Sequence, residues 1–204
     1  MKLYGSLGMG SAVVEVVLAL AKQPYEFIPT SFWDQNAHFD ALKKINPQAK
    51  VPTLQLDDGT VMTESAAILL FFAEKVPGLI PDDPSKRAAF YRWMVFIAAN
   101  IYAMFDIGDE PSRWVDGEET QLALKQKSVE KQKFFWSLME QQLQPDPYVL
   151  GASMTVLDVY IAMVSRWRPG RAWFNENCPK LSSAVALTET HPVVAAVWEN
   201  NFGK

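Results

Sequence analysis

Residues 46–69, "NPQAKVPTLQLDDGTVMTESAAIL", are the stretch that decides the fold. Two short strands, "VPTLQL" and "TVMT", are joined by "DDG", in which Gly59 supplies the positive φ of a tight turn. A helix over "SAAILLFFAEKV" follows, starting at Ser65 and stopping before Pro77-Gly78. The stretch therefore predicts an antiparallel hairpin that leads into a helix.

The residues before this stretch alternate between strand and helix. The pattern predicts strands in "MKLYG" (1–5) and "YEFIPT" (25–30), a helix that is apolar nearly all round over 11–22, and an amphipathic helix over 36–45. The order β-α-β-α-β-β-α predicts a parallel pair formed through right-handed crossovers, with the hairpin added to it. The first region is thus a small mixed α/β unit.

The rest of the chain has a different character. "GLIPDDPSK" (78–86) is typical of a linker, and no strand is predicted after it. The predicted helices cover 85–106, 118–143, 155–168 and 179–200, the last broken at "HP" (191–192). We therefore predict domains at 1–78 and 85–204, with 79–84 as the linker and the second domain all-helical.

Composition and charge argue against several functions. The chain has 204 residues, a formal net charge of −4 and only sparse basic clusters, so neither nucleic acid nor an anionic membrane is an expected partner. The apolar run 12–21 contains Glu15, resembles no secretory signal, and falls far short of the roughly 20 residues of a membrane span. A cytoplasmic location is the expectation.

Cysteine and histidine are scarce. Cys178 is the single cysteine, which excludes an intramolecular disulfide. With His38 and His191 as the two histidines, no zinc site is expected and no metal is predicted.

Two local motifs allow a binding role beside a structural one. Val51-Pro52 is either an ordinary strand opening or a cis bond that leaves the Val51 N–H and C=O open to a peptide-like ligand. Ser65 is either a plain N-cap or, with the helix dipole, a partner for a carboxylate. Glu64 beside it is able to pair with an ammonium group. Together, Glu64 and Ser65 would hold the amino-acid end of a ligand.

Two further motifs carry less functional weight. Thr155 and Asp158, in "TVLD", form a capping box whose expected role is to start a helix. The turn "GSLGMGS" (5–11) is not a GxGxxG motif and is a weak signal for a nucleotide.

These features in this order resemble the glutathione transferase family over essentially the whole chain. The segment 46–69 carries most of the resemblance, together with the opening "KLY" and the helix "RWMVFIAANIY", as in bacterial beta-like and theta-like members. The resemblance implies a thioredoxin-like first domain, a helical second domain and glutathione as co-substrate. It also implies a homodimer, for which Phe71, Phe72 and Arg87 are conceivable interface residues.

The resemblance assigns a glutathione-binding role to five residues. Val51, before Pro52, would bond the cysteinyl part through its backbone, and Glu64 with Ser65 would hold the γ-glutamyl end. Lys50 is available for the glycyl carboxylate, although a solvated surface lysine is an equal interpretation.

The sulfur-activating residue is where this chain departs from the family pattern. Gly10 stands at the cysteine position of beta-like members, Gly5 at the tyrosine position of tyrosine-type members, and Met9 near the serine of theta-like and delta-like members. The candidates are the Ser11 hydroxyl, which would otherwise cap the first helix, the helix N-terminus itself, and Ser6.

The second substrate, a small hydrophobic electrophile, is expected to bind between the two regions, because ligand pockets favour domain interfaces. Tyr102 matches a polar position of beta-like members and is a candidate catalytic donor, with core packing as the other interpretation. The candidate pocket residues are Met9, Phe105, Trp114 and Trp167.

Three functions follow from these features. The first is a detoxifying transferase that ionises glutathione and conjugates it to the electrophile. The second is a glutathione-dependent disulfide or peroxide reductase, although no cysteine lies at the first helix. The third is a non-catalytic binding protein, which the lack of a residue in the usual activating position keeps open.

Overall fold

Four short strands form one mixed sheet in the order β2-β1-β3-β4. They are β1 (Lys2–Gly5), β2 (Glu26–Pro29), β3 (Thr53–Gln55) and β4 (Val61–Met62). β1 pairs with β2 in parallel and with β3 antiparallel, and β3 pairs with β4 antiparallel. The computed structural model describes residues 1–30 and 36–203. The predicted β-α-β-α-β-β-α order and the mixed sheet are confirmed.

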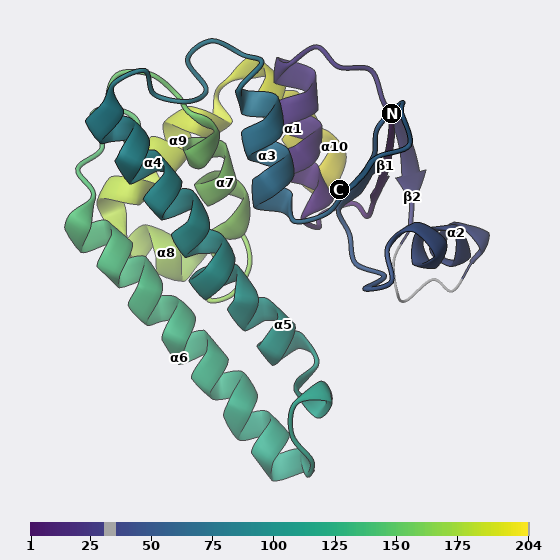
Figure 1. Cartoon of the computed structure of the whole chain (residues 1–204). Coiled ribbons are helices and arrows are strands. Elements are labelled where there is room, and N and C mark those ends of the chain that lie inside the picture. Colours follow the sequence, from purple (N-terminus) through teal and green to yellow (C-terminus); the bar gives the residue numbers. More distant parts are fainter. Residues whose placement is uncertain (31–35, 204) are drawn as a thin grey trace. The chain divides into compact units, whose positions relative to one another are not determined.

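Helices cover both faces of this sheet (Figure 1). On one face, Tyr4 packs with Phe39 and Leu42 of α2 (Ala37–Ile45). On the other lie α1 (Ser11–Leu20) and α3 (Ser65–Ala73), which contact each other. Because α1 also contacts α10 (Pro192–Phe202), it needs the nearly all-round apolar surface seen in its sequence.

The contacts divide the chain into two compact units. The first unit is Met1–Ile80 together with Glu189–Lys204, and the second is Pro81–Thr188. The predicted helical domain runs from residue 85 to 204, whereas α10 packs in the first unit. The reason is its apolar face, since Val194 and Trp198 are buried and the helix contacts α1.

Helices account for the second unit. These are α4 (Pro84–Phe96), the π-helix η1 (Ile97–Tyr102), α5 (Ala103–Asp109), the 3-10 helix η2 (Pro111–Arg113), α6 (Glu118–Gln142), α7 (Val156–Val164), α8 (Arg171–Asn177) and α9 (Pro179–Glu189). One helix was predicted over 85–106, and the structure has three successive segments there. η2 and α8 were not predicted.

All nine residues of α7 are buried, and its capping box is present as predicted. The N–H and hydroxyl of Thr155 donate to Asp158 Oδ2 at 2.8 and 2.7 Å, and the N–H of Val149 donates to Asp158 Oδ1 at 2.8 Å. Burial raises the pKa of Asp158, while these hydrogen bonds act in the opposite direction. The carboxylate thus ties the preceding loop to the helix start.

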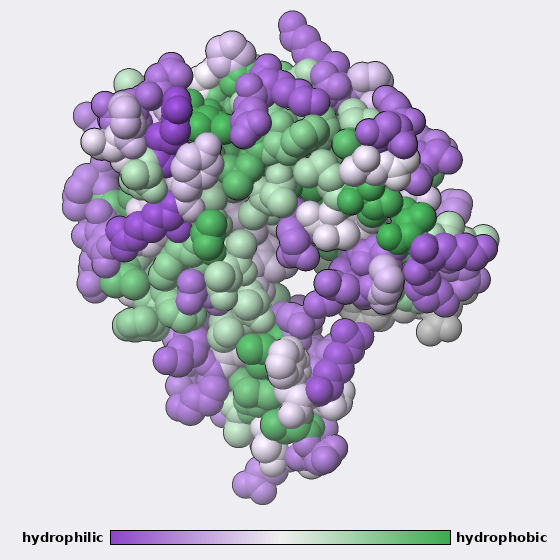
Figure 2. Space-filling view, viewed as in Figure 1, coloured by the Kyte–Doolittle hydropathy of each residue, from purple (hydrophilic) through white to green (hydrophobic). Residues whose placement is uncertain are grey.

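The helical stretch Pro84–Asp109 is long and apolar enough, by length and composition, to cross a membrane. In the structure its segments contact α6 and α7, and 33% of its most apolar window is buried. Figure 2 shows hydrophobic and hydrophilic residues mixed over this face of the molecule. Tyr91 and Val95 of α4 are exposed.

The three conceivable interface residues differ in their exposure to solvent. Phe72 is fully buried, so its assignment to a surface is wrong, because this side of α3 faces the core. Phe71 is 37% exposed. Arg87 is exposed, and its Nε donates to the Pro81 carbonyl at 2.8 Å.

Candidate functional site

A buried asparagine shapes the loop that enters β3. Asn46 Nδ2 donates to the Lys50 carbonyl at 3.2 Å and to Thr53 Oγ1 at 2.8 Å, and Thr53 Oγ1 donates to the same carbonyl at 2.8 Å. Asn46 Oδ1 accepts the N–H of Gln48 at 3.0 Å. The structure shows that Asn46 fixes the Lys50 backbone next to Val51.

The Val51-Pro52 bond is cis, which confirms the sharper of the two expectations. Val51 is half-buried against the Tyr4 cluster and lies outside the β3 ladder, which begins at Thr53. Within residues 1–30 and 36–203, no hydrogen bond joins another residue to the Val51 N–H or C=O. These two groups have the geometry of an edge that a peptide-like ligand can extend. Lys50 is exposed beside them.

Glu64 and Ser65 lie at the start of α3. Glu64 is the N-cap residue, with φ 64° and ψ 104°, and Ser65 is the first helical residue, so the N-cap assignment of Ser65 is wrong. A positive φ at a residue other than glycine costs about 1–3 kcal/mol and is typical of residues that clamp a ligand. Glu64 is exposed at this position, next to the positive end of the helix dipole.

Ser11 is fully buried and closes the turn after β1. Its Oγ accepts the Ser6 N–H at 3.1 Å and donates to the Ser6 carbonyl at 2.9 Å. Gly10 is the N-cap residue of α1, so Ser11 does not cap this helix. The hydroxyl proton is directed at the Ser6 carbonyl. In this geometry Ser11 stabilises the turn.

Gly5 has no room for a side chain. A Cβ at this position would lie 2.5 Å from Ser11 Cβ, 2.7 Å from Ser11 Oγ and 2.8 Å from Phe27 Cε2. The tyrosine that tyrosine-type members carry at this position therefore does not fit here. Leu7, at 56% exposure, and the half-buried Met9 leave the turn accessible from outside.

An aromatic cluster lies within the second unit and contains three of the predicted residues. Tyr102 meets Phe105 and Trp167 edge-on, with ring centroids 5.8 and 5.6 Å apart, and Phe105 lies 5.2 Å from Trp167. Tyr160 stacks on Tyr102 at 6.3 Å. Trp114 is 54% exposed after η2. Tyr102 and Trp167 are half-buried, and Phe105 is buried.

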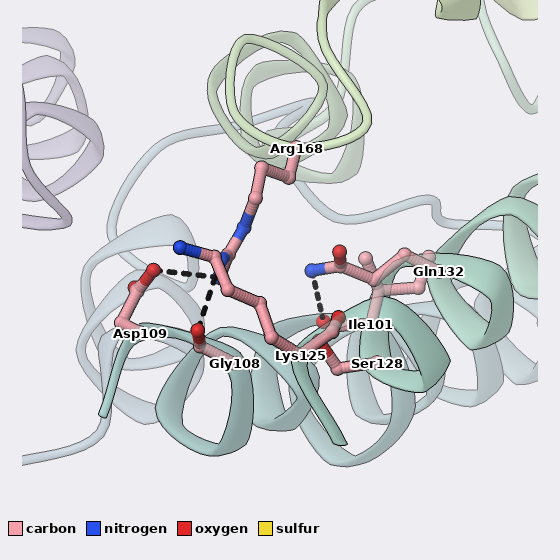
Figure 3. Close-up of polar contacts among 7 residues, drawn as sticks. All are labelled: Ile101, Gly108, Asp109, Lys125, Ser128, Gln132 and Arg168. Atoms are coloured by element: carbon pink, nitrogen blue, oxygen red, sulfur yellow. Dashed lines mark hydrogen bonds and ion pairs between the residues drawn. The ribbon is translucent and has the colours of Figure 1, made fainter. Parts of the chain in front are cut away.

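Polar contacts that the sequence did not reveal hold the helices carrying this cluster (Figure 3). Arg168 Nη1 donates to the Gly108 carbonyl at 3.1 Å, and Nη2 lies 2.6 Å from Asp109 Oδ1. The guanidinium also lies over the Phe105 ring at 5.6 Å. Gln132, fully buried in α6, donates to the Ile101 carbonyl of η1 at 3.5 Å. Neither residue belongs to a sequence motif, so only the packing identifies them.

Residues 1–30 and 36–203 contain no group of three His, Cys, Asp or Glu side chains arranged to hold a metal ion.

A mixed β-α-β-α-β-β-α unit with an open cis-proline loop and a helix N-terminus, followed by a helical unit, defines the fold of the glutathione transferases. Residues 3–79 match the family description "Glutathione S-transferase, N-terminal domain". The chain is 35% identical to the uncharacterised GST-like protein YncG of Escherichia coli K12 over 98% of both chains. This chain belongs to the glutathione transferase family.

Two other comparisons bear on the site. A crystal structure of a glutathione transferase homologue from Sulfitobacter, with bound glutathione, has a TM-score of 0.87 and 27% identity, and the match covers 98% of this chain and 97% of that one. A probable maleylacetoacetate isomerase of Caenorhabditis elegans is 38% identical over 96 residues, which is 46% of this chain and 44% of the relative.

Proposed function

We propose that this protein binds and ionises glutathione and conjugates it to a small hydrophobic electrophile. The observation that carries the proposal is the start of α3, where exposed Glu64 is held at φ 64° directly before Ser65. A carboxylate next to a helix N-terminus offers complementary partners to the ammonium and carboxylate of one amino-acid end. The glutathione bound to the Sulfitobacter homologue supports this ligand.

The cysteinyl and glycyl parts of glutathione are proposed to lie along the loop before β3. In this proposal the Val51 N–H and C=O pair with the cysteinyl residue, and Pro52 holds the turn that presents them. Lys50 meets the glycyl carboxylate as an exposed charge, a contact worth about 0–1 kcal/mol. Asn46 contributes by fixing the Lys50 carbonyl.

The sulfur is proposed to lie at the turn 6–10 and the N-terminus of α1. A free thiol has a pKa near 8.5, so lowering it by about two units makes about three quarters of it thiolate at pH 7. Backbone N–H groups and the positive end of the helix supply this stabilisation, and Ser11 keeps the turn in place through Ser6. The thiolate then forms the new C–S bond to the electrophilic carbon.

The helical unit is proposed to contribute apolar contact and one donor. Phe105 and Trp167 provide the aromatic surface, and the Tyr102 hydroxyl donates to charge that develops on the electrophile. A homodimer, implied by the resemblance, and a cytoplasmic location, expected from the sequence, stay part of the proposal.

Thiolate absorbance in the ultraviolet tests the proposal. Glutathione bound to the protein is titrated from acid to alkaline pH, with Ser11→Ala as the variant and exposed Ser112→Ala as the control. We expect a thiol pKa well below that of free glutathione, shifted by less than about one unit in Ser11→Ala. A return to the free value in Ser11→Ala assigns the hydroxyl itself to the sulfur. Binding with an unshifted pKa contradicts the proposal.

The C. elegans relative supports a second candidate, a glutathione-dependent isomerisation. In it the thiolate adds to a carbon–carbon double bond, rotation follows, and elimination returns the thiolate unchanged. Mass spectrometry separates the two functions, because conjugation consumes glutathione and isomerisation does not.

A further inference from the structure

The turn after β1 has a second anchor, which comes from the far end of the chain. The Gly8 N–H donates to Asn201 Oδ1 at 3.1 Å, and both residues lie in the first compact unit. Gly8 has φ +74°, and a Cβ added there would lie 3.6 Å from the Asn201 carbonyl oxygen and 3.8 Å from the Phe202 ring. The C-terminal end of α10 thus adjoins the turn proposed to hold the sulfur.

The Asn201 amide has one orientation that satisfies all its neighbours. Its Nδ2 donates to Glu15 Oε1 at 3.0 Å and to the Val197 carbonyl at 3.1 Å, so Oδ1 is the atom left for the Gly8 N–H. Glu15 lies on α1, and its Oε2 accepts the Tyr25 hydroxyl at 3.1 Å. Burial raises the pKa of Glu15, and the hydrogen bonds from Asn201 and Tyr25 oppose that rise.

The turn is therefore held at two points. Ser11 binds Ser6 from the inside, and Asn201 binds Gly8 from the α10 side. Stabilising a thiolate with backbone donors requires those donors to stay within about 0.5 Å of the productive geometry. Glycines at positions 8 and 10 give the turn little stiffness of its own.

We infer that Asn201 is a positioning residue of the glutathione thiolate site, which acts by holding Gly8. The inference rests on the proposed function and extends it, because it makes the last helix of the chain part of the thiol-ionising site. It also gives a role to the packing of α10 in the first unit, which the sequence order of the helices does not reveal.

The test compares Asn201→Ala and Asn201→Ser with Asn200→Ala, a control of the same residue type that is exposed on the same helix. Three quantities are measured: the pKa of the bound glutathione thiol, the Kd of S-methylglutathione, and the hydrogen-exchange rate of the Gly8 amide. S-methylglutathione has no ionisable thiol, so its Kd reports binding alone.

In both Asn201 variants we expect the thiol pKa to rise by about one unit and Gly8 exchange to rise at least about tenfold. The Kd of S-methylglutathione should stay within about twofold of the wild-type value, and Asn200→Ala should change none of the three. Asn201→Ser, the smaller change, is decisive if Asn201→Ala fails to fold.

The outcomes separate the inference from the proposed function. If the wild type ionises bound glutathione and both Asn201 variants do so with the same pKa, the inference is overturned and the proposed function stands. Loss of S-methylglutathione binding in step with the pKa change indicates a general structural role and overturns it too. If the wild-type Gly8 amide exchanges like an unstructured peptide, the anchor is absent. If the wild type does not bind glutathione, both ideas fail.

Discussion

Cys178 carries the one thiol in the chain, and the structure buries it. It is fully buried at the C-terminal end of α8, and burial, together with the charge of Glu140, raises its pKa to about 12. Glu140 is held there because it accepts the N–H groups of Lys180 and Leu181, both at 3.0 Å. A thiolate is required for nucleophilic attack, so this cysteine is unsuited to act as a redox or catalytic thiol.

Alkylation kinetics test this conclusion. We expect iodoacetamide to leave Cys178 of the native protein unmodified at neutral pH and to modify it readily in denaturing urea, measured by intact-protein mass spectrometry. Any enzymatic activity of the native protein should be unchanged after treatment with iodoacetamide. Rapid native modification would show that the thiol is accessible and that its pKa is not raised.

The raised pKa of Cys178 also predicts how stability changes with pH. Above about 8.5 the unfolded chain loses the thiol proton while the native chain keeps it up to about pH 12. The native state then binds more protons, so the free energy of unfolding falls as pH rises through this window. Urea unfolding of Cys178→Ala should lack this part of the alkaline decline.

The role of Ser11 shows the limit of sequence reasoning at the residue scale. The sequence identified Ser11 as the hydroxyl near the first helix and left its role open between sulfur and cap. The structure shows the Ser11 hydroxyl bonded to the Ser6 backbone and Gly10 as the N-cap residue, contacts that the sequence does not reveal. Similarly, the Asn46 contacts with Lys50 and Thr53 depend on the folded loop.

At the element scale, the start of α7 depends on one carboxylate. Asp158 is 1% exposed and accepts hydrogen bonds from the Val149 N–H and from the N–H and hydroxyl of Thr155. Asp158→Ala leaves two backbone N–H groups buried without a partner, each at a cost of about 1–3 kcal/mol. We therefore expect the free energy of unfolding to fall by about 2–5 kcal/mol, measured by urea titration.

An exposed aspartate gives the matched control for this prediction. Asp116→Ala, in the loop before α6, should change the free energy of unfolding by less than about 0.5 kcal/mol. Equal effects of the two substitutions would contradict the role of Asp158 in starting α7.

Elements with local signals were predictable, and elements set by packing were not. The hairpin was marked by "DDG" and the capping box by "TVLD", and both form as predicted. No local pattern marks the π-helical turn η1, whose Ile101 carbonyl accepts a hydrogen bond from Gln132 on α6. α8 is only seven residues long and lies between prolines, too short for a periodic pattern.

At the scale of the whole molecule, the first compact unit is built from both ends of the chain. Helix order alone placed α10 with the other helices, whereas its contacts with α1 place it beside the sheet. Membership of the family and the two-region organisation were predictable from the sequence, because the segment 46–69 and the helical run that follows are local patterns. The return of α10 is a long-range contact, for which no local pattern exists.

This architecture predicts how the molecule responds to losing its last helix. A chain ending at Glu189 loses Val194 and Trp198, two buried side chains worth roughly 1.5–3 kcal/mol each. It also loses the Asn201 contacts with Gly8 and Glu15. We expect hydrogen exchange in α1 to rise strongly and glutathione affinity to be lost, while α6, in the second unit, keeps its protection as the internal control. If α1 keeps its protection and glutathione still binds, α10 is dispensable to the first unit. If α1 and α6 lose protection together, the two units unfold as one.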